Sequence, residues 1–155
     1  MSNVVIRKAQ SADCARVLEL MQELAVFEGY IHKFRVTVPK LGYYLFEQKS
    51  IEVLVATVEE DIEGILVYFF QPFTYDLCPW LVIKEFYVST VYRGLGVGHE
   101  LFNYARQEAA ENKCSKIKWE VLTDNSKAQR FYVRHGAQIE SDWRIMSIDI
   151  ATDDQ

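Results

Sequence analysis

The N-terminal part of the chain shows a strand pattern followed by a helical one. Residues 4–8 are rich in β-branched side chains and predict a first strand. Ser11 is a candidate N-cap for the helix that follows. Its apolar positions recur at helical spacing: Val17, Leu18, Met21, Leu24 and Ala25.

A second helix is predicted to start at Thr37 and Pro39, because proline is tolerated in a first turn, where amides have no partner within the helix. This helix would carry Leu41 and Leu45. Residues 27–36, between the two helices, are polar and aromatic. We expect them to form a loop that is free to line a site.

The middle of the chain has the pattern of adjacent strands. Residues 51–58 and 64–70 are rich in β-branched and aromatic side chains, and the acidic residues 59–61 between them predict a hairpin turn. Residues 72–79 read as a loop. Residues 81–88 then form a nearly unbroken apolar strand.

The C-terminal part alternates helices and strands. From Val97 the apolar positions follow helical spacing, and residues 117–122 predict another strand. Residues 126–135 predict a helix ended by Gly136, which suits the left-handed position after a helix. Residues 143–150 predict a closing strand.

Composition limits the partners that the chain can recognise. Of 155 residues, 17 are Lys or Arg and 22 are Asp or Glu, so the net charge is −5. This mild acidity, without a long basic run, does not favour nucleic acid as a partner. Because there is no basic region followed by a long apolar stretch, and no run of membrane-spanning length, we expect neither secretion nor membrane insertion. The length predicts a single domain, residues 1–155.

Cysteine and histidine give no metal or nucleophile motif. Cys14, Cys78 and Cys114 are odd in number, and no histidine accompanies them at metal-ligand spacing. We interpret them as reduced, half-buried packing residues, which fits a cytoplasmic protein without a bound metal.

A glycine-rich segment, Arg93-Gly94-Leu95-Gly96-Val97-Gly98, lies between a buried strand and an amphipathic helix. Glycines let backbone amides approach phosphate oxygens, and the guanidinium of Arg93 can add charge-assisted hydrogen bonds. A Walker loop would need Lys and Ser or Thr after Gly98, where His99 and Glu100 stand. A dinucleotide fold would place the loop after the first strand, whereas this loop follows the fourth predicted strand. The segment therefore indicates a pyrophosphate site of another kind.

These residues resemble the GNAT superfamily of N-acetyltransferases, whose cofactor motif is Arg or Gln, two residues, Gly, one residue, then Gly or Ala. Arg93, Gly96 and Gly98 match it. A second block, residues 125–132 followed by Gly136, stands where the family places its Asn and Tyr, and two motifs in order are more specific than one. The resemblance implies an α/β (α+β) fold with a mixed, mostly antiparallel sheet flanked by helices on both faces. It also implies a splayed strand pair at the acetyl-CoA site.

Over nearly the whole chain the resemblance narrows to the spermidine/spermine (diamine) acetyltransferase branch and its thialysine-acetylating relatives. Four stretches carry it: residues 5–9, 23–28, 73–76 and 143–149. It implies that Glu28 and Asp76 receive a cationic amine and that the protein is a homodimer. Where the branch usually has a Glu-Asp pair, this chain has Lys84 and Glu85. This departure concerns the acceptor, with Lys84 as a substrate-binding candidate, and leaves the cofactor motif intact.

The chemistry assigns roles to two side chains. An alkylammonium group has a pKa of about 10.4, so a base must remove its proton before transfer, and Glu85 is the candidate. Tyr132 resembles the family's general acid, which would protonate the leaving CoA thiolate. Each has a structural alternative: Glu85 as a salt-bridged strand residue and Tyr132 as a packing side chain.

The cofactor site implied by the resemblance is mostly backbone. Phe86, Tyr87 and Val88 would receive the pantetheine arm and stabilise the thioester oxygen. The loop over residues 93–98, with Asn125, Ala128 and Tyr132, would hold the rest of acetyl-CoA. Asn125 is explained equally well as a helix cap.

Three functions remain open at this point. The first is acetyl transfer to a small amine, either a diamine, a polyamine or a basic amino acid such as thialysine. The second changes the acceptor to a protein N-terminus or an aminoglycoside, because Lys84 stands where an acid is expected. The third is a catalytically silent module that binds acyl-CoA.

Overall fold

The computed structural model describes residues 3–152. The described part of the chain forms two compact units, which divide between Glu120 and Val121. The single domain expected from the length of the chain stays a prediction.

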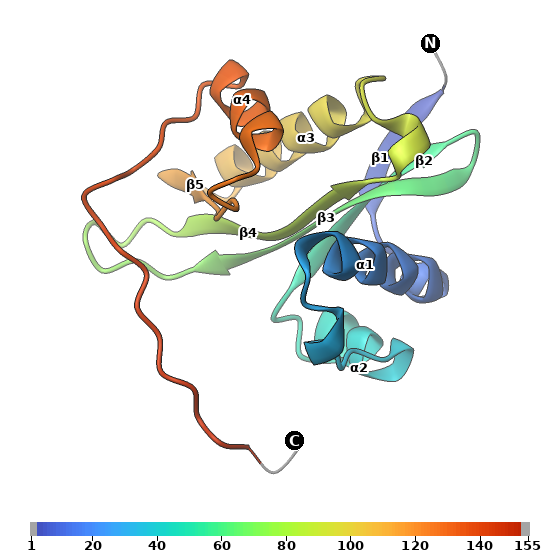
Figure 1. The fold of residues 1–155 in the computed structure, drawn as a ribbon, viewed down its shortest axis with the longest axis horizontal. Helices are drawn as coiled ribbons and strands as arrows, with labels where there is room; N and C mark the ends of the chain where they lie inside the picture. The colour runs from blue at the N-terminus through green and yellow to red at the C-terminus, as the bar shows by residue number, and fades with distance from the viewer. Residues whose placement is uncertain (1–2, 153–155) are drawn as a thin grey trace. The chain divides into compact units, whose positions relative to one another are not determined.

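A five-stranded sheet organises the larger unit (Figure 1). Its strands are β1 (Val4–Lys8), β2 (Glu52–Val58), β3 (Asp61–Gln71), β4 (Trp80–Val88) and β5 (Lys116–Lys118). They lie side by side in the order of the chain; β1 to β4 pair antiparallel and β5 pairs parallel to β4. The mixed, mostly antiparallel sheet expected from the sequence is confirmed. The last strand is shorter than the predicted residues 117–122.

Helices cover both faces of this sheet, as expected (Figure 1). They are α1 (Cys14–Glu28), α2 (Val38–Gly42), which continues into a π-helical turn (Tyr43–Glu47), and α3 (Val97–Glu111). α1 and α2 lie on one face and α3 on the other. The predicted start of the second helix is confirmed, because the Thr37 hydroxyl accepts a hydrogen bond from the Lys40 amide.

The first helix begins later than Ser11 predicts. Ser11–Asp13 form a 3-10 turn, and α1 begins at Cys14. The Asp13 carboxylate accepts a hydrogen bond of 2.7 Å from the Gln10 amide and bonds the Arg7 guanidinium at 2.7 Å. Because Asp13 holds the chain entering the helix, Ser11 is not the cap.

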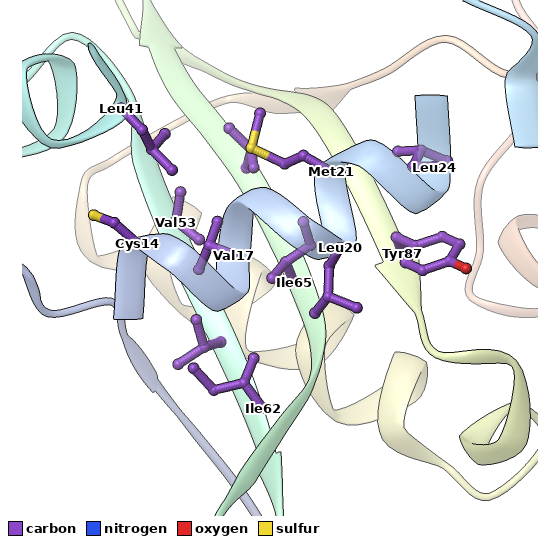
Figure 2. Close-up of a cluster of buried hydrophobic side chains, with 12 residues drawn as sticks. Cys14, Val17, Leu20, Met21, Leu24, Leu41, Val53, Ile62, Ile65 and Tyr87 are labelled. Atoms are coloured by element: carbon purple, nitrogen blue, oxygen red, sulfur yellow. The ribbon is translucent and has the colours of Figure 1, made fainter. Parts of the chain in front are cut away.

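The main core lies between α1 and the sheet (Figure 2). The buried side chains of α1 are Cys14, Val17, Leu20, Met21, Leu24 and Ala25. They pack against side chains of β2 to β4 that point to the same face: Val53, Val55, Ile65, Val67 and Tyr87. Full burial of such a side chain contributes roughly 1.5–3 kcal/mol, so this layer fixes α1 firmly on the sheet.

A bulge in β4 changes which side chains face α1. Val67 of β3 is opposite Glu85, but the next residue, Tyr68, is opposite Ile83, so Lys84 has no partner in β3. Val67 belongs to the α1 core, whereas the Tyr68 hydroxyl donates to Glu108 of α3. Because one extra residue reverses the alternation of a strand, Ile83 faces α3 while Glu85 and Tyr87 face α1.

The sheet opens between β4 and β5. The parallel pairing joins only three residues of β4, Trp80, Leu81 and Val82, to Lys116–Lys118. The pairing with β5 ends at Val82, and residues 83–88 of β4 continue past it. Since strand residues alternate the direction of their backbone groups, part of the amides and carbonyls of 83–88 point to this side of β4. The splayed strand pair expected from the family resemblance is therefore present.

The smaller unit contains α4 (Ser126–Arg134). Gly136 follows this helix with φ of 93°, which confirms the predicted left-handed end. The closing strand predicted over residues 143–150 is wrong: residues 138–152 have no regular structure, and Trp143 is 81% exposed. An extended segment forms a strand only beside a partner strand, which periodicity alone does not supply.

Gly64 tests the contact between β3 and α3. An added Cβ would lie 3.0 Å from Leu101 Cδ1 and 3.2 Å from Val97 Cγ1 of α3. We expect Gly64→Val to lower the free energy of unfolding by about 1–3 kcal/mol, the scale of overpacking in a dense core. Urea denaturation would measure this. Gly42→Ala is the control, since nothing lies within 4 Å of its added Cβ and alanine favours the helix. A midpoint for Gly64→Val equal to that of the wild type would contradict the close packing.

Candidate active site

The C-terminal end of α1 directs Tyr30 toward β4. Gly29 has φ of 85°, in the left-handed region. Its amide bonds the Val26 carbonyl at 3.2 Å, and the Tyr30 amide bonds the Ala25 carbonyl at 2.9 Å. These two bonds make a Schellman motif, which ends a helix and fixes the direction of the chain that leaves it.

Tyr30 joins two of the predicted site residues. Its hydroxyl donates a hydrogen bond of 3.2 Å to Oε2 of Glu85, across 55 positions of sequence. Glu28, the last residue of α1, is half-buried and close enough to interact electrostatically with both side chains. The structure thus brings together a candidate base, Glu85, and a candidate amine-binding residue, Glu28.

Burial sets the proton affinity of this cluster. It raises the pKa of Glu85 above the ordinary value for glutamate, and the negative charge of Glu28 raises it further. The Tyr30 hydrogen bond and the nearby Lys84 charge act in the opposite direction. Burial also raises the pKa of Glu28 and, with Glu85 beside it, that of Tyr30. A carboxylate with a raised pKa is a better base than one in water.

Arg93 lies against the same end of α1 and β4. Its guanidinium carbon is 5.1 Å from the centre of the Tyr87 ring and 5.6 Å from that of Phe27. Its Nε donates to the Val88 carbonyl at 2.9 Å. These contacts hold the cation at the C-terminal end of β4.

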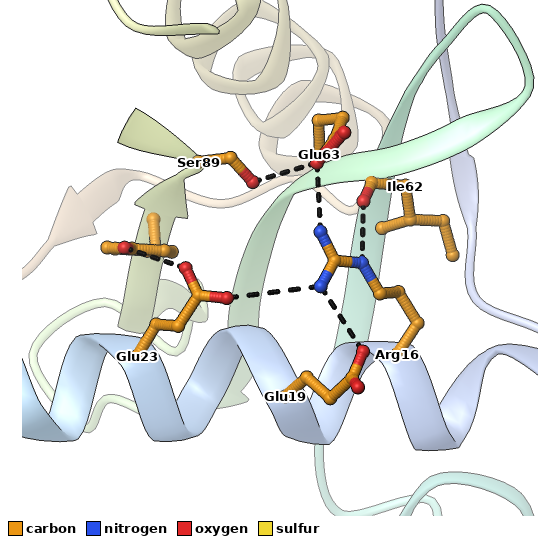
Figure 3. A network of polar contacts seen from close by, with 7 residues as sticks. Arg16, Glu19, Glu23, Ile62, Glu63 and Ser89 are labelled. Atoms are coloured by element: carbon orange, nitrogen blue, oxygen red, sulfur yellow. Dashed lines mark hydrogen bonds and ion pairs between the residues drawn. The ribbon is translucent and has the colours of Figure 1, made fainter. Parts of the chain in front are cut away.

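A polar network links the C-terminal end of β4 to α1 and β3 (Figure 3). Arg16 of α1 bonds the Glu63 carboxylate at 2.8 Å, and Glu63 accepts a hydrogen bond of 2.9 Å from the Ser89 hydroxyl. The Ser89 amide also donates to the Glu63 carbonyl at 2.8 Å. On the other side Arg16 is 3.9 Å from Glu23, which accepts from the Tyr87 hydroxyl at 3.0 Å. The residues that lead into the glycine loop are therefore fixed to α1 and β3.

The glycine loop adopts conformations that favour glycine. Gly94 and Gly96 have φ of 78° and 88°. Gly96 precedes α3, and over the described residues no side chain caps that helix. The first amides of α3, from Val97 onward, have no carbonyl partner within the helix and point out of its N-terminus. A helix N-terminus of this kind favours a bound anion.

These features fit acetyl-CoA. Residues 93–96 and the first turn of α3 offer amides and a cation for its pyrophosphate, and residues 83–88 of β4 continue past the pairing with β5, on the side where a pantetheine arm could run. Glu85 lies in the same half of β4, at the bulge. A ligand that ran from the loop along this edge would bring its reactive end toward Glu85.

Of the other predicted residues, Asp76 lies apart from this cluster and Lys84 lies next to it. Asp76 is exposed in the loop that precedes β4, at the opposite end of that strand from the glycine loop, and its carboxylate accepts from the Cys78 amide at 3.0 Å. Lys84 is exposed at the bulge, beside Glu85 in the chain. Leu95 is 49% exposed at the tip of the glycine loop.

In the smaller unit, the side-chain oxygen of Asn125 accepts a hydrogen bond of 3.1 Å from the Ala128 amide. This is the capping role that the sequence left open for Asn125. Tyr132 is half-buried on α4, with its ring edge-on to Phe131 at 5.5 Å between centres.

Sequence reasoning missed Tyr30 and the rings that hold Arg93. Tyr30 stands in a segment interpreted only as a loop, and its partner is 55 positions away. The glycine directly before it, after an apolar helix, signals a helix end that could have pointed to a fixed direction for Tyr30. No local pattern identifies Phe27 or Tyr87 as partners of Arg93.

The described residues contain no group of three or more His, Cys, Asp or Glu side chains arranged to hold a metal ion. All three cysteines are free thiols; Cys14 is buried and the other two are half-buried. Among the described helices, none is both long and apolar enough to cross a membrane.

Comparison with known proteins defines the class. The model of the acetyltransferase (GNAT) family matches residues 18–137. The chain therefore belongs to this family and is an acetyl-CoA-dependent N-acetyltransferase.

Its relatives by sequence include mouse (Mus musculus) thialysine N-epsilon-acetyltransferase, 28% identical over 89% of this chain and 86% of the relative. It is also similar to human (Homo sapiens) spermidine/spermine N(1)-acetyltransferase-like protein 1, 29% identical over 85% of this chain and 20% of that protein. Among solved structures, an aminoglycoside acetyltransferase from an uncultured soil sample, in complex with trehalose, shares the fold. Its TM-score is 0.80 at 20% identity, over 96% of this chain and 97% of that one.

Gly94 tests the strain in the glycine loop. Nothing lies within 4 Å of a Cβ added there, so only the backbone conformation opposes a side chain. We expect Gly94→Ala to lower the free energy of unfolding by about 1–2 kcal/mol, because a left-handed residue with a Cβ is strained. Gly94→Asn should cost less, since asparagine visits this region more readily. Urea denaturation without ligand measures both; an equal loss for the two variants would contradict the explanation.

Proposed function

We propose that this acetyltransferase transfers an acetyl group from acetyl-CoA to the primary amine of a small molecule, a basic amino acid such as thialysine or lysine, or a diamine or polyamine. The observation that carries the proposal is the position of Glu85. It is half-buried, bonded to Tyr30 beside Glu28, and lies in the open half of β4 next to the glycine loop.

The backbone would hold the co-substrate, which supplies the acetyl thioester. Amides of residues 94–98 at the start of α3, with Arg93, would bind the pyrophosphate. Backbone groups of Phe86, Tyr87 and Val88 would bind the pantetheine arm, and a preorganised amide there would stabilise negative charge on the thioester oxygen. The end of the β4–β5 pairing at Val82 supports this assignment.

Glu85 would take the proton of the amine, directly or through one water molecule. Its raised pKa brings its proton affinity closer to that of the amine, and its partial burial weakens competition from water. Glu28 adds a second negative charge beside it, which favours an incoming ammonium group. The amine would then attack the thioester carbon directly, with no acyl group on the protein.

Tyr132 would give a proton to the sulfur that leaves. A phenol is a donor at neutral pH, and the family motif places a tyrosine at this position. Asn125 and Ala128 would line the cofactor site from the first turn of α4. The cap made by the Asn125 oxygen leaves its side-chain NH₂ group to donate to a ligand.

Lys84 and Asp76 would influence which acceptor binds. Lys84 places a positive charge at the bulge beside Glu85, where it repels a second ammonium group and attracts a carboxylate. A basic amino acid carries both an amine and a carboxylate, so it suits this site better than a polyamine. The similarity to thialysine N-epsilon-acetyltransferase supports the same choice. Asp76 would bind the distant end of a longer substrate.

We also propose that the protein acts in the cytoplasm as a homodimer. The three free thiols support a reducing compartment. Trp143, Ile145 and Ile148 are 81%, 75% and 87% exposed, and apolar side chains gathered on one segment favour a protein partner that covers them.

A thiol-release assay with acetyl-CoA tests the proposed function. We expect release with a small amine, faster with thialysine or lysine than with spermine because of Lys84. Putrescine, spermidine, a short peptide and an aminoglycoside complete the panel. Acetylation of the peptide or the aminoglycoside alone would favour an acceptor of that kind. Binding of CoA without release for any amine would instead indicate a silent acyl-CoA-binding module.

Tyr132→Phe tests the general acid. The variant keeps the ring and removes only the hydroxyl, so we expect kcat to fall by roughly two orders of magnitude with nearly unchanged affinity for CoA. Turnover and calorimetric binding would measure the two effects. Tyr44→Phe, at a tyrosine 48% exposed in the π-helical turn, is the control. Wild-type turnover of Tyr132→Phe would remove this residue from the mechanism.

A further inference from the structure

We propose that Tyr30 is a positioning residue for Glu85: its hydroxyl fixes one carboxylate oxygen, Oε2, and leaves the other to receive the proton of the acceptor amine. The inference rests on the proposed function, in which Glu85 is the base. The 3.2 Å hydrogen bond between the two side chains carries it.

Two irregular features of the backbone create this contact. The Schellman motif at Gly29 turns the chain after α1 so that Tyr30 returns to the sheet. The bulge at Lys84 rotates Glu85 from the α3 face of the sheet to the α1 face. If either feature were regular, the two side chains would point elsewhere. A left-handed turn and a bulge each interrupt regular hydrogen bonding, and here both direct side chains to the same point.

The charges around Glu85 explain why a hydrogen-bond donor is useful there. Burial and the negative charge of Glu28 at the end of α1 both favour the protonated carboxyl group, which cannot act as a base. Tyr30 and the Lys84 cation of β4 favour the ionised form. Tyr30 itself stays protonated at ordinary pH, because its own pKa is raised. Farther along β4 and α1 the same face carries Tyr87, Glu23, Arg93 and Arg16, and Arg16 is paired with Glu63 of β3.

The pH dependence of Tyr30→Phe tests the proposal. The hydrogen bond stabilises the ionised carboxylate, so its removal should raise the pKa of Glu85 and move the acidic limb of kcat/KM to higher pH, by roughly one unit. Below that limb the rate should fall about tenfold, and above it the two enzymes should converge. KM for acetyl-CoA should not change. Tyr43→Phe is the matched control, because the hydroxyl of this exposed tyrosine bonds Gln48 outside the site.

A double-mutant cycle separates positioning from a general structural role. If Tyr30 acts through Glu85, then Tyr30→Phe should change the rate less than about twofold in a Glu85→Gln background, since the group that it positions is gone. The full tenfold effect in that background would overturn the proposal. Urea denaturation of each variant shows whether it is folded.

The proposed function and the positioning role fail in different ways. A wild-type rate for Glu85→Gln would overturn the base assignment and, with it, the role of Tyr30. A slow Glu85→Gln enzyme together with a wild-type pH profile for Tyr30→Phe would overturn the positioning role alone.

Discussion

The bulge at Lys84 is the constraint on which the rest of the site depends. One unpaired residue in the middle of β4 reverses the direction of every side chain after it, so that Glu85 and Tyr87 face α1 while Phe86 faces α3. Glu85 then reaches Tyr30, and Tyr87 provides the ring under Arg93. A bulge also increases the local twist of a strand. It lies just past the last residue of β4 that pairs with β5, so the opening of the sheet begins where the strand changes its course.

The two halves of the site rely on different parts of the chain. The proposed cofactor half would consist of backbone: residues 83–88 of β4, two glycines with positive φ, and the start of α3. Backbone groups keep their positions as long as the strand and helix are fixed. The polar network of Arg16, Glu63 and Ser89 fixes the residues that follow β4 to α1 and β3. The proposed acceptor half would consist of side chains, Glu28, Tyr30 and Glu85, whose charge and burial set the direction in which the pKa of Glu85 is shifted.

Most of the fold follows from local patterns, whereas the contacts within the site do not. The strands and helices of residues 4–111 follow from the spacing of apolar residues, and the glycine loop follows from its motif, because both signals are local in sequence. The bulge has no such signal. In the sequence, Lys84 is only a lysine in the place where the related enzymes usually have an acid. The pairing of β4 with β3 is what shows that Lys84 is the extra residue. The contact of Tyr30 with Glu85 depends on that pairing, so the sequence could not predict this contact either. The prediction of a closing strand was wrong for a related reason. Residues 143–150 have the composition of a strand, but no described strand lies beside them.

The separation of backbone and side-chain roles has a consequence for specificity. A change of side chain at Glu28, Tyr30, Lys84 or Glu85 alters charge and shape on the α1 face, but it leaves the open edge of β4 and the glycine loop as they are. With the site as proposed, the acceptor could therefore diverge while the cofactor site persists. Proteins similar to this chain in sequence or in fold are named for acceptors as different as thialysine and aminoglycosides. In the proposed site, a positive charge at the bulge and two carboxylates beside it would favour an acceptor with opposite charges at its two ends.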